Sequence, residues 1–146
     1  MRRWLWIALG FRLLFLIAVP VLSDDYFRFI WDGRLVAAGY NPYLYLPSAL
    51  IDSSIAADAQ LDSVLFKGMN SPDYFTVYPP LNQIMFGLAT WLAGGHTLLT
   101  VVWLRILIIL AEAGIFWLMM YPSKSVSPLI HKNKRPQFAL TYALNP

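Results

Sequence analysis

Two adjacent carboxylates, Asp24 and Asp25, directly follow a long apolar run that ends at Leu22. This run is long enough to place both carboxylates at a membrane surface, just outside the lipid. Carboxylates are costly to leave unpaired there, so their position asks for a chemical reason. One such reason is general-base catalysis, in which a carboxylate within about 2.6–3.2 Å of a hydroxyl takes up its proton.

The segment that must position these carboxylates is a predicted amphipathic helix over residues 24–38. Ser23 or Asp24 can cap its start, and Gly39 suits the position just past its end. The spacing places Tyr26, Phe29, Ile30, Gly33 and Ala37 on an apolar face, and Asp25, Arg28 and Asp32 on a charged face. The alternative to a chemical role is a solvated face, in which Asp24 is only a cap and Asp25 forms an exposed pair with Arg28.

The composition is that of a membrane protein, because 58% of the 146 residues are hydrophobic and only 13% are charged. Two runs, Trp4–Leu22 and Thr97–Tyr121, approach or exceed the roughly 20 residues that cross a bilayer. A shorter segment, Pro79–Leu92, is predicted to be a helix on the outer membrane face, ended by the glycines that follow it. A cleaved signal peptide is the alternative for the first run.

The charges orient these segments. Seven acidic but only three basic residues lie between the two long runs, whereas four basic residues and no acid follow Tyr121. The positive-inside rule therefore places the N-terminus and residues 122–136 in the cytoplasm, and residues 23–96 in an outer loop. Residues 138–146 look like the start of a further span. We therefore expect an all-α integral membrane protein with two long spans and juxtamembrane helices, of which this chain is a fragment.

Several classes of function are excluded or unsupported. The absence of Cys excludes disulfides and Cys-based metal or redox sites. His96 and His131 are isolated, so no metal site is indicated. The basic residues lie at the ends of apolar segments rather than along a stripe, which argues against nucleic acid as a partner.

An ordered set of short motifs resembles the N-terminal part of the GT-C type membrane glycosyltransferases, in particular bacterial mannosyltransferase-like members. The motifs are Asp24-Asp25-Tyr26-Phe27-Arg28-Phe29, Trp31-Asp32-Gly33-Arg34, Gly39-Tyr40-Asn41-Pro42-Tyr43, Tyr78-Pro79-Pro80-Leu81 and Leu144-Asn145-Pro146. The resemblance implies transfer of a hexose such as mannose from a polyprenyl phosphate to a hydroxyl of a glycan or lipid acceptor. It also implies an outer-face reaction at a bacterial inner membrane, and a chain that is inactive without further spans.

In that family an acid just after the first span is the catalytic base, which here is Asp25 or Asp24. The resemblance adds substrate-binding candidates, which are Arg28, Asp32, Arg34, Asn41, Tyr78 and Arg105. The arginines could bind the leaving phosphate, and Tyr78 or Trp31 could stack on a sugar. Alternatively, Arg28 pairs with Asp25 or Asp32, and Arg34 reaches to lipid headgroups. No cofactor other than the lipid-linked donor is indicated, and the need for a divalent metal stays open.

Two further readings remain, a transporter fragment and a non-catalytic membrane module. A transporter would carry polar residues at the middle of several broken spans, whereas here the polar residues gather in the outer loop. Two charges do fall inside the long runs, Arg12 in the first and Glu112 in the second. Each would be costly alone in lipid, so we expect them to approach each other.

Overall fold

The computed structural model describes residues 7, 10–18, 20, 23–120, 141 and 142, and it contains no strand among them. Two compact units make up the chain. We call residues 19–107 the loop unit, and residues 1–18 together with 108–146 the terminal unit. Each is described by itself.

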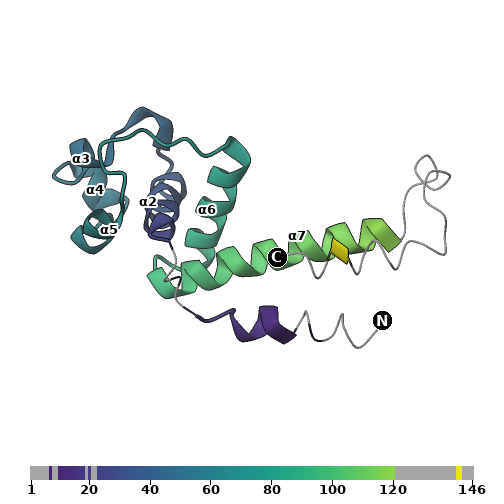
Figure 1. Ribbon diagram of the computed structural model, residues 1–146. Coiled ribbons are helices and arrows are strands. Elements are labelled where there is room, and N and C mark those ends of the chain that lie inside the picture. The colour runs from purple at the N-terminus through teal and green to yellow at the C-terminus, as the bar shows by residue number, and fades with distance from the viewer. Residues whose placement is uncertain (1–6, 8–9, 19, 21–22, 121–140, 143–146) are drawn as a thin grey trace. The chain divides into compact units, whose positions relative to one another are not determined.

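The loop unit consists of helices of very different lengths (Figure 1). They are α2 (Asp25–Ala37), η1 (Pro42–Leu44), α3 (Pro47–Leu50), α4 (Ser54–Asp58), α5 (Ser63–Gly68), α6 (Pro80–Leu92) and the first part of α7 (Thr97–Met120). Three predicted helices are therefore confirmed to within one residue at each end. Helices α4 and α5 are separate, because the chain turns at Ala59 and Gln60.

Helices α2 and α6 pack directly on each other, and their closest approach is made by glycine. A Cβ atom on Gly33 of α2 would lie 2.5 Å from both the carbonyl oxygen of Phe86 and the hydroxyl of Thr90 on α6. A Cβ atom on Gly87 of α6 would likewise lie 2.5 Å from Cγ1 of Val36. The two backbones can come this close only because neither glycine carries a side chain.

The opposite side of α2 contributes to the hydrophobic core of the loop unit. Ile30, Trp31 and Leu35 are fully buried there, with the short helices α3, α4 and α5 supplying much of the rest. Trp31 is therefore a core residue, and the expectation that it could stack on a sugar is wrong. Its ring lies 6.0 Å from that of Phe66 on α5.

Glycine ends α2 and α6 as the sequence predicts. Gly39 and Gly94 both have positive φ angles, of 85° and 58°. At each end the next residue donates its N–H back across the turn, from Tyr40 to Leu35 and from Gly95 to Thr90. This is the Schellman arrangement, which satisfies carbonyls that a helix end leaves unpaired.

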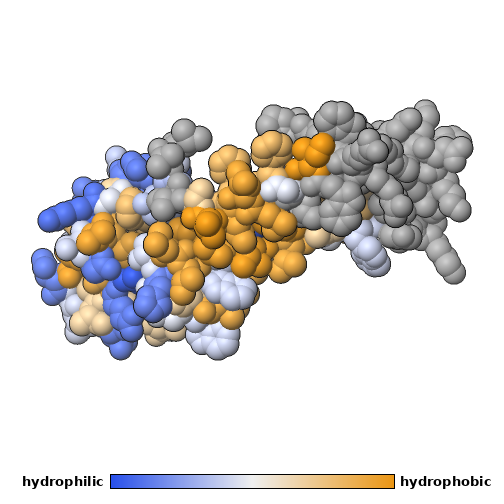
Figure 2. All heavy atoms as spheres, turned by 90° about the horizontal axis from the view of Figure 1, so that it is seen from below, coloured by the Kyte–Doolittle hydropathy of each residue, from blue (hydrophilic) through white to orange (hydrophobic). Residues whose placement is uncertain are grey.

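Helix α6 has one buried and one exposed face. Gln83, Phe86 and Thr90 are buried against the loop unit, whereas the exposed face carries Leu81, Ile84, Leu88 and Trp91 at helical spacing. Its thirteen residues would extend about 20 Å, too short for the roughly 30 Å of a bilayer core. In Figure 2 hydrophilic residues gather on the side of the loop unit that carries α3, α4 and α5.

The first apolar run is not the continuous helix that was predicted up to Leu22. Residues 10–14 are helical, residues 15–17 form a turn, and Ala18 and Pro20 lie outside regular structure. Pro20 contributes to this interruption, because its nitrogen carries no N–H to donate to the carbonyl of Leu16. The early part of the run lies largely outside the described residues.

Helix α7 is long and apolar enough to cross a membrane, and among the described residues it alone meets that criterion. In the terminal unit, Glu112 of α7 forms an ion pair with Arg12, with Nε to Oε2 at 2.5 Å and Nη2 to Oε1 at 3.2 Å. The predicted approach of these two charges is confirmed. The predicted cytoplasmic loop 122–136 and most of the predicted span 138–146 lie outside the described residues.

Candidate active site

Asp24 and Asp25 lie at the start of α2, as predicted, but their surroundings differ. Asp24 is exposed and is the N-cap residue, although its side chain makes no capping hydrogen bond. Asp25 is partly buried. Its carboxylate accepts a hydrogen bond from Ser23 Oγ at 2.9 Å, and Asn70 Nδ2 lies at 3.5 Å on its other oxygen. Of the two acids, Asp25 is thus the one whose carboxylate has hydrogen-bond partners among the described side chains.

One helical turn further on, the charged face of α2 is buried rather than solvated. Arg28 and Asp32 are 3% and 0% exposed and form an ion pair of 2.9 Å between Nε and Oδ1. The second oxygen of Asp32 accepts from Gln83 Nε2 of α6 at 2.9 Å, and the same nitrogen donates to Thr76 at 2.8 Å. The alternative that this face is exposed to solvent is therefore wrong for Arg28 and Asp32. Arg28 was expected to pair with Asp25 or Asp32, and it pairs with Asp32.

Arg28 also fixes the segment that approaches Asp25. Its Nη1 donates to the backbone carbonyl oxygens of Ser71 at 3.0 Å and Tyr74 at 2.9 Å. Asn70, the residue before Ser71, is the one that contacts Asp25. The buried ion pair therefore holds a loop whose first residues form one side of the Asp25 environment.

Tyr78 lies in an aromatic cluster at the same end of the loop unit. Its ring makes edge-to-face contacts with Phe29 and Phe86, with centroids 5.0 and 5.6 Å away, and those two rings stack on each other. Burial and the negative charge of Asp25 both raise the pKa of Tyr78 above its ordinary value. The phenol therefore stays protonated at neutral pH and above.

Asn41 acts on this cluster through its neighbour. Its side-chain oxygen accepts from the backbone N–H of Tyr43 at 3.0 Å and so caps η1. The hydroxyl of Tyr43 then donates to the backbone carbonyl of Tyr78. Two motifs that are 35 residues apart in the sequence are joined by this contact.

Arg34 points to a different part of the loop unit. It is 8% exposed and donates to the carbonyl oxygens of Gln60 and Gly95, and to the carboxylate of Asp62 at 3.0 Å. The guanidinium therefore binds groups within the protein, and the alternative that it extends to lipid headgroups is wrong. Arg105, the last of the predicted cations, lies partly buried on α7.

Sequence reasoning missed several residues of this site. Hydrogen bonds join Asn70 to Asp25 and Gln83 to Asp32. The hydroxyl of Thr76 accepts from the same Gln83 nitrogen. Gln83 had a usable signal, since it is a polar side chain on the face of α6 that otherwise packs Phe86 and Thr90 against α2. Asn70 had none, because its contact depends on a long irregular segment. Within the described ranges, no group of three or more His, Cys, Asp or Glu residues could hold a metal ion.

Comparison with known proteins gives one informative result. Residues 1–127 match the sequence family described as the N-terminal domain of alpha-(1->6)-mannopyranosyltransferases. The chain belongs to this family. Membership confirms the predicted resemblance to mannosyltransferases and indicates glycosyl transfer, with a sugar donor and an acceptor. No curated protein and no solved structure matches the chain.

The arrangement around Asp25 combines two features of the described residues. It offers a partly exposed carboxylate whose rotamer is held by a hydroxyl and an amide. It also offers an aromatic wall that ends in a protonated phenol. The matched family and the apolar α7 together indicate a membrane protein.

Proposed function

We propose that this chain forms the N-terminal part of a GT-C type mannosyltransferase that uses a polyprenyl-phosphate sugar. The observation that carries the proposal is the carboxylate of Asp25, partly exposed at the start of α2 and held by Ser23 and Asn70. Family membership supports mannose as the transferred sugar and an α-1,6 linkage as the product.

In the proposed reaction an oxygen of the acceptor hydroxyl attacks C1 of the lipid-linked mannose. The bond between C1 and the phosphate oxygen breaks, and the lipid phosphate leaves with the electron pair. Asp25 takes the proton of the attacking hydroxyl, as a general base within hydrogen-bond distance. Attack opposite the leaving group inverts the configuration at C1. Asp24 is the second candidate, but no described side chain orients it.

The remaining candidates divide into groups that bind substrate and groups that position the site. Arg28 and Asp32 are buried and hydrogen-bonded to protein partners, so we assign them to positioning the loop beside Asp25. Asn41 positions Tyr78 through Tyr43, and Tyr78 forms a wall for the sugar. Arg105, on α7, is the cation we assign to the leaving phosphate, because cationic donors stabilise charge that develops there.

We place the loop unit on the outer face of a bacterial inner membrane, with α7 as a span. The exposed apolar face of α6 supports this placement, because Leu81, Ile84 and Leu88 would otherwise face water. The acidic balance of residues 23–96 and the basic balance of residues 122–136 support the same orientation.

The test is a transfer assay on membranes that contain the full-length protein of the native gene, with polyprenyl-phosphate mannose as donor. Asp25→Asn keeps the size of the side chain but cannot accept the proton, so we expect transfer to fall by about 10²–10⁴-fold. Asp52→Asn is the matched control, because Asp52 is exposed and lies in a turn remote in sequence from the site. It should leave the rate unchanged.

Asp24→Asn separates the two acids, and we expect it to retain most of the activity. Near wild-type rates for both the Asp24 and the Asp25 variants would remove the base from this loop. A native protein that transfers no mannose from this donor, while folding and inserting normally, would favour the non-catalytic membrane module.

A further inference from the structure

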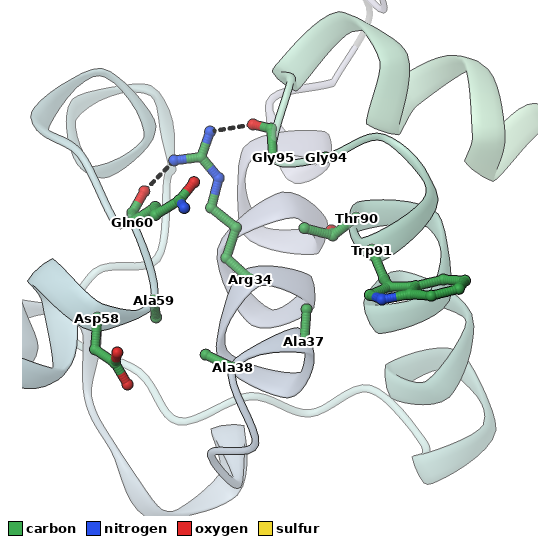
Figure 3. Close-up of a pocket in the computed structure, with 10 residues that line it drawn as sticks. All are labelled: Arg34, Ala37, Ala38, Asp58, Ala59, Gln60, Thr90, Trp91, Gly94 and Gly95. Carbon is green, nitrogen blue, oxygen red and sulfur yellow. Dashed lines mark hydrogen bonds between the residues drawn. The ribbon is translucent and has the colours of Figure 1, made fainter.

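A pocket of about 220 Å³ lies at the other end of α2, where the C-terminal ends of α2, α4 and α6 come together (Figure 3). This volume is below the roughly 300–1,000 Å³ of pockets for drug-sized ligands, so it suits a single small unit. Arg34, Ala38, Asp58 and Gln60 are among the residues that line it.

Arg34 reaches into this region from α2, and one of its donors is left over. Figure 3 shows its guanidinium between Gln60 and Gly95, whose carbonyl oxygens it contacts. The remaining N–H, on Nε, is buried and has no hydrogen-bond partner among the described residues. Because buried donors are seldom left unpaired, an oxygen acceptor supplied by a ligand would complete this arginine.

Gln60 adds a side-chain amide to the lining of the same pocket. It occupies the position after the C-cap of α4 with φ of 54°, whereas α2 and α6 have Gly39 and Gly94 at the equivalent position. A residue with a Cβ atom is strained at this positive φ, and glycine would adopt it at a lower conformational energy. The bond from Arg34 uses only the backbone carbonyl of Gln60. The side-chain amide lies in the pocket lining, with its Oε1 next to Gly95.

The chemistry of the pocket suits a neutral polyhydroxyl compound better than an anion. Three helix C-termini converge on it, and their carbonyl ends carry partial negative charge. The carboxylate of Asp58 adds to this and also accepts from the hydroxyl of Tyr40 at 2.8 Å. Sugar hydroxyls both donate and accept, so they match the N–H of Arg34, the amide of Gln60 and the oxygens of Asp58. The methyl groups of Ala38 and Ala59 offer a small apolar surface for the C–H groups of a sugar ring.

We propose that this pocket binds a mannose unit of the acceptor glycan, remote from the unit that reacts. The proposal rests on the proposed function, since it deepens the identity of the acceptor. Asp25 and Ala38 are thirteen residues apart at the two ends of α2, a separation of about 20 Å. A sugar in the pocket would thus lie several units from the reacting hydroxyl, and would retain a glycan acceptor rather than take part in bond formation.

The experiment measures binding of α-methyl mannoside and of a 1→6-linked mannose trisaccharide to the purified full-length protein, without donor, by ligand-observed NMR. Gln60→Gly removes the amide and relieves the strained φ, so it should weaken binding about three- to tenfold without lowering thermal stability. Ala38→Leu fills the pocket from an exposed position and should abolish binding. Ala57→Leu makes the same change at an exposed site of α4 outside the lining, and should bind as the wild type does.

The Asp25→Asn variant keeps the result separate from the proposed catalytic role, because it should bind both probes normally. Wild-type affinity in both Gln60→Gly and Ala38→Leu, or no detectable binding by the wild-type protein, overturns the pocket proposal whatever the transfer assay gives. In turnover, Gln60→Gly should raise KM for a long mannose acceptor and leave kcat unchanged. A fall in kcat at unchanged KM would contradict a binding role.

Discussion

Replacing Arg28 by Met should lower the free energy of unfolding of the loop unit by more than the removal of any surface charge does. Arg28 and its partner Asp32 are both buried, so the substitution leaves a carboxylate in the interior with only the amide of Gln83 to satisfy it. Removing one partner of a buried ion pair costs about 3–5 kcal/mol. The two carbonyls of Ser71 and Tyr74 also lose their donor, so we expect the upper part of that range.

The assay is native-state proteolysis of the full-length protein in detergent, which reports the free energy of opening of this unit. Lys67→Met is the matched control, because Lys67 is an exposed cation on α5, and it should change that free energy by less than about 0.5 kcal/mol. The double variant Arg28→Met with Asp32→Leu removes both charges and should recover about 2 kcal/mol or more of the loss.

Two outcomes would refute this reasoning. One is a cost below about 1 kcal/mol for Arg28→Met, which would mean that water or another group compensates Asp32. The other is a double variant no more stable than Arg28→Met alone. Either result would favour the alternative that the charged face of α2 is exposed to solvent.

Three further predictions follow from the packing and the charges. Gly33→Ala should destabilise the loop unit by about 1–2 kcal/mol, because the clash of the new methyl group with a backbone carbonyl outweighs the better helix propensity of Ala. In Gly87→Ala the new methyl group meets a valine side chain, so this variant should lose less stability. Urea titration of the purified variants would rank the two losses. Exchanging Arg12 and Glu112 should retain more folded protein in membranes than either single reversal, as judged by yield and protease resistance, unless the pair contributes nothing. Because the pKa of Tyr78 is raised in the folded state, its contribution to the free energy of unfolding should be fully present below about pH 10 and lost as the pH rises through the folded-state pKa. In alkaline unfolding curves, Tyr78→Phe should reduce this loss of stability.

The sequence predicted those parts of the fold that depend on local rules. Helices α2, α6 and α7 have clear periodicity or length, and Gly39 and Gly94 end the first two by backbone preference alone. The run that was expected to be helical up to Leu22 departs from a helix after residue 14, and the prediction rested on its apolar length without considering Pro20.

The burial of the charged face could not be read from the sequence. The spacing of Arg28 and Asp32 is the same whether that face meets water or protein. What decides is the position of Gln83 on α6 and of two carbonyls in an irregular segment more than 40 residues away. Contacts of this kind depend on how the elements pack, which no periodicity encodes.

The arrangement along α2 gives these observations a common consequence. Asp25 lies at its first residue, the ion pair with Asp32 fixes its middle against α6, and Arg34 fixes its last turn to the ends of α4 and α6. A helix held at three levels cannot tilt or shift without breaking buried bonds, so its two ends keep a constant separation of about 20 Å. If the proposed base and the proposed sugar pocket both act, this separation sets how far a bound mannose unit lies from the hydroxyl that is extended. Acceptors too short to reach both ends should then react with a higher KM than longer ones, and that dependence on length should disappear in Ala38→Leu.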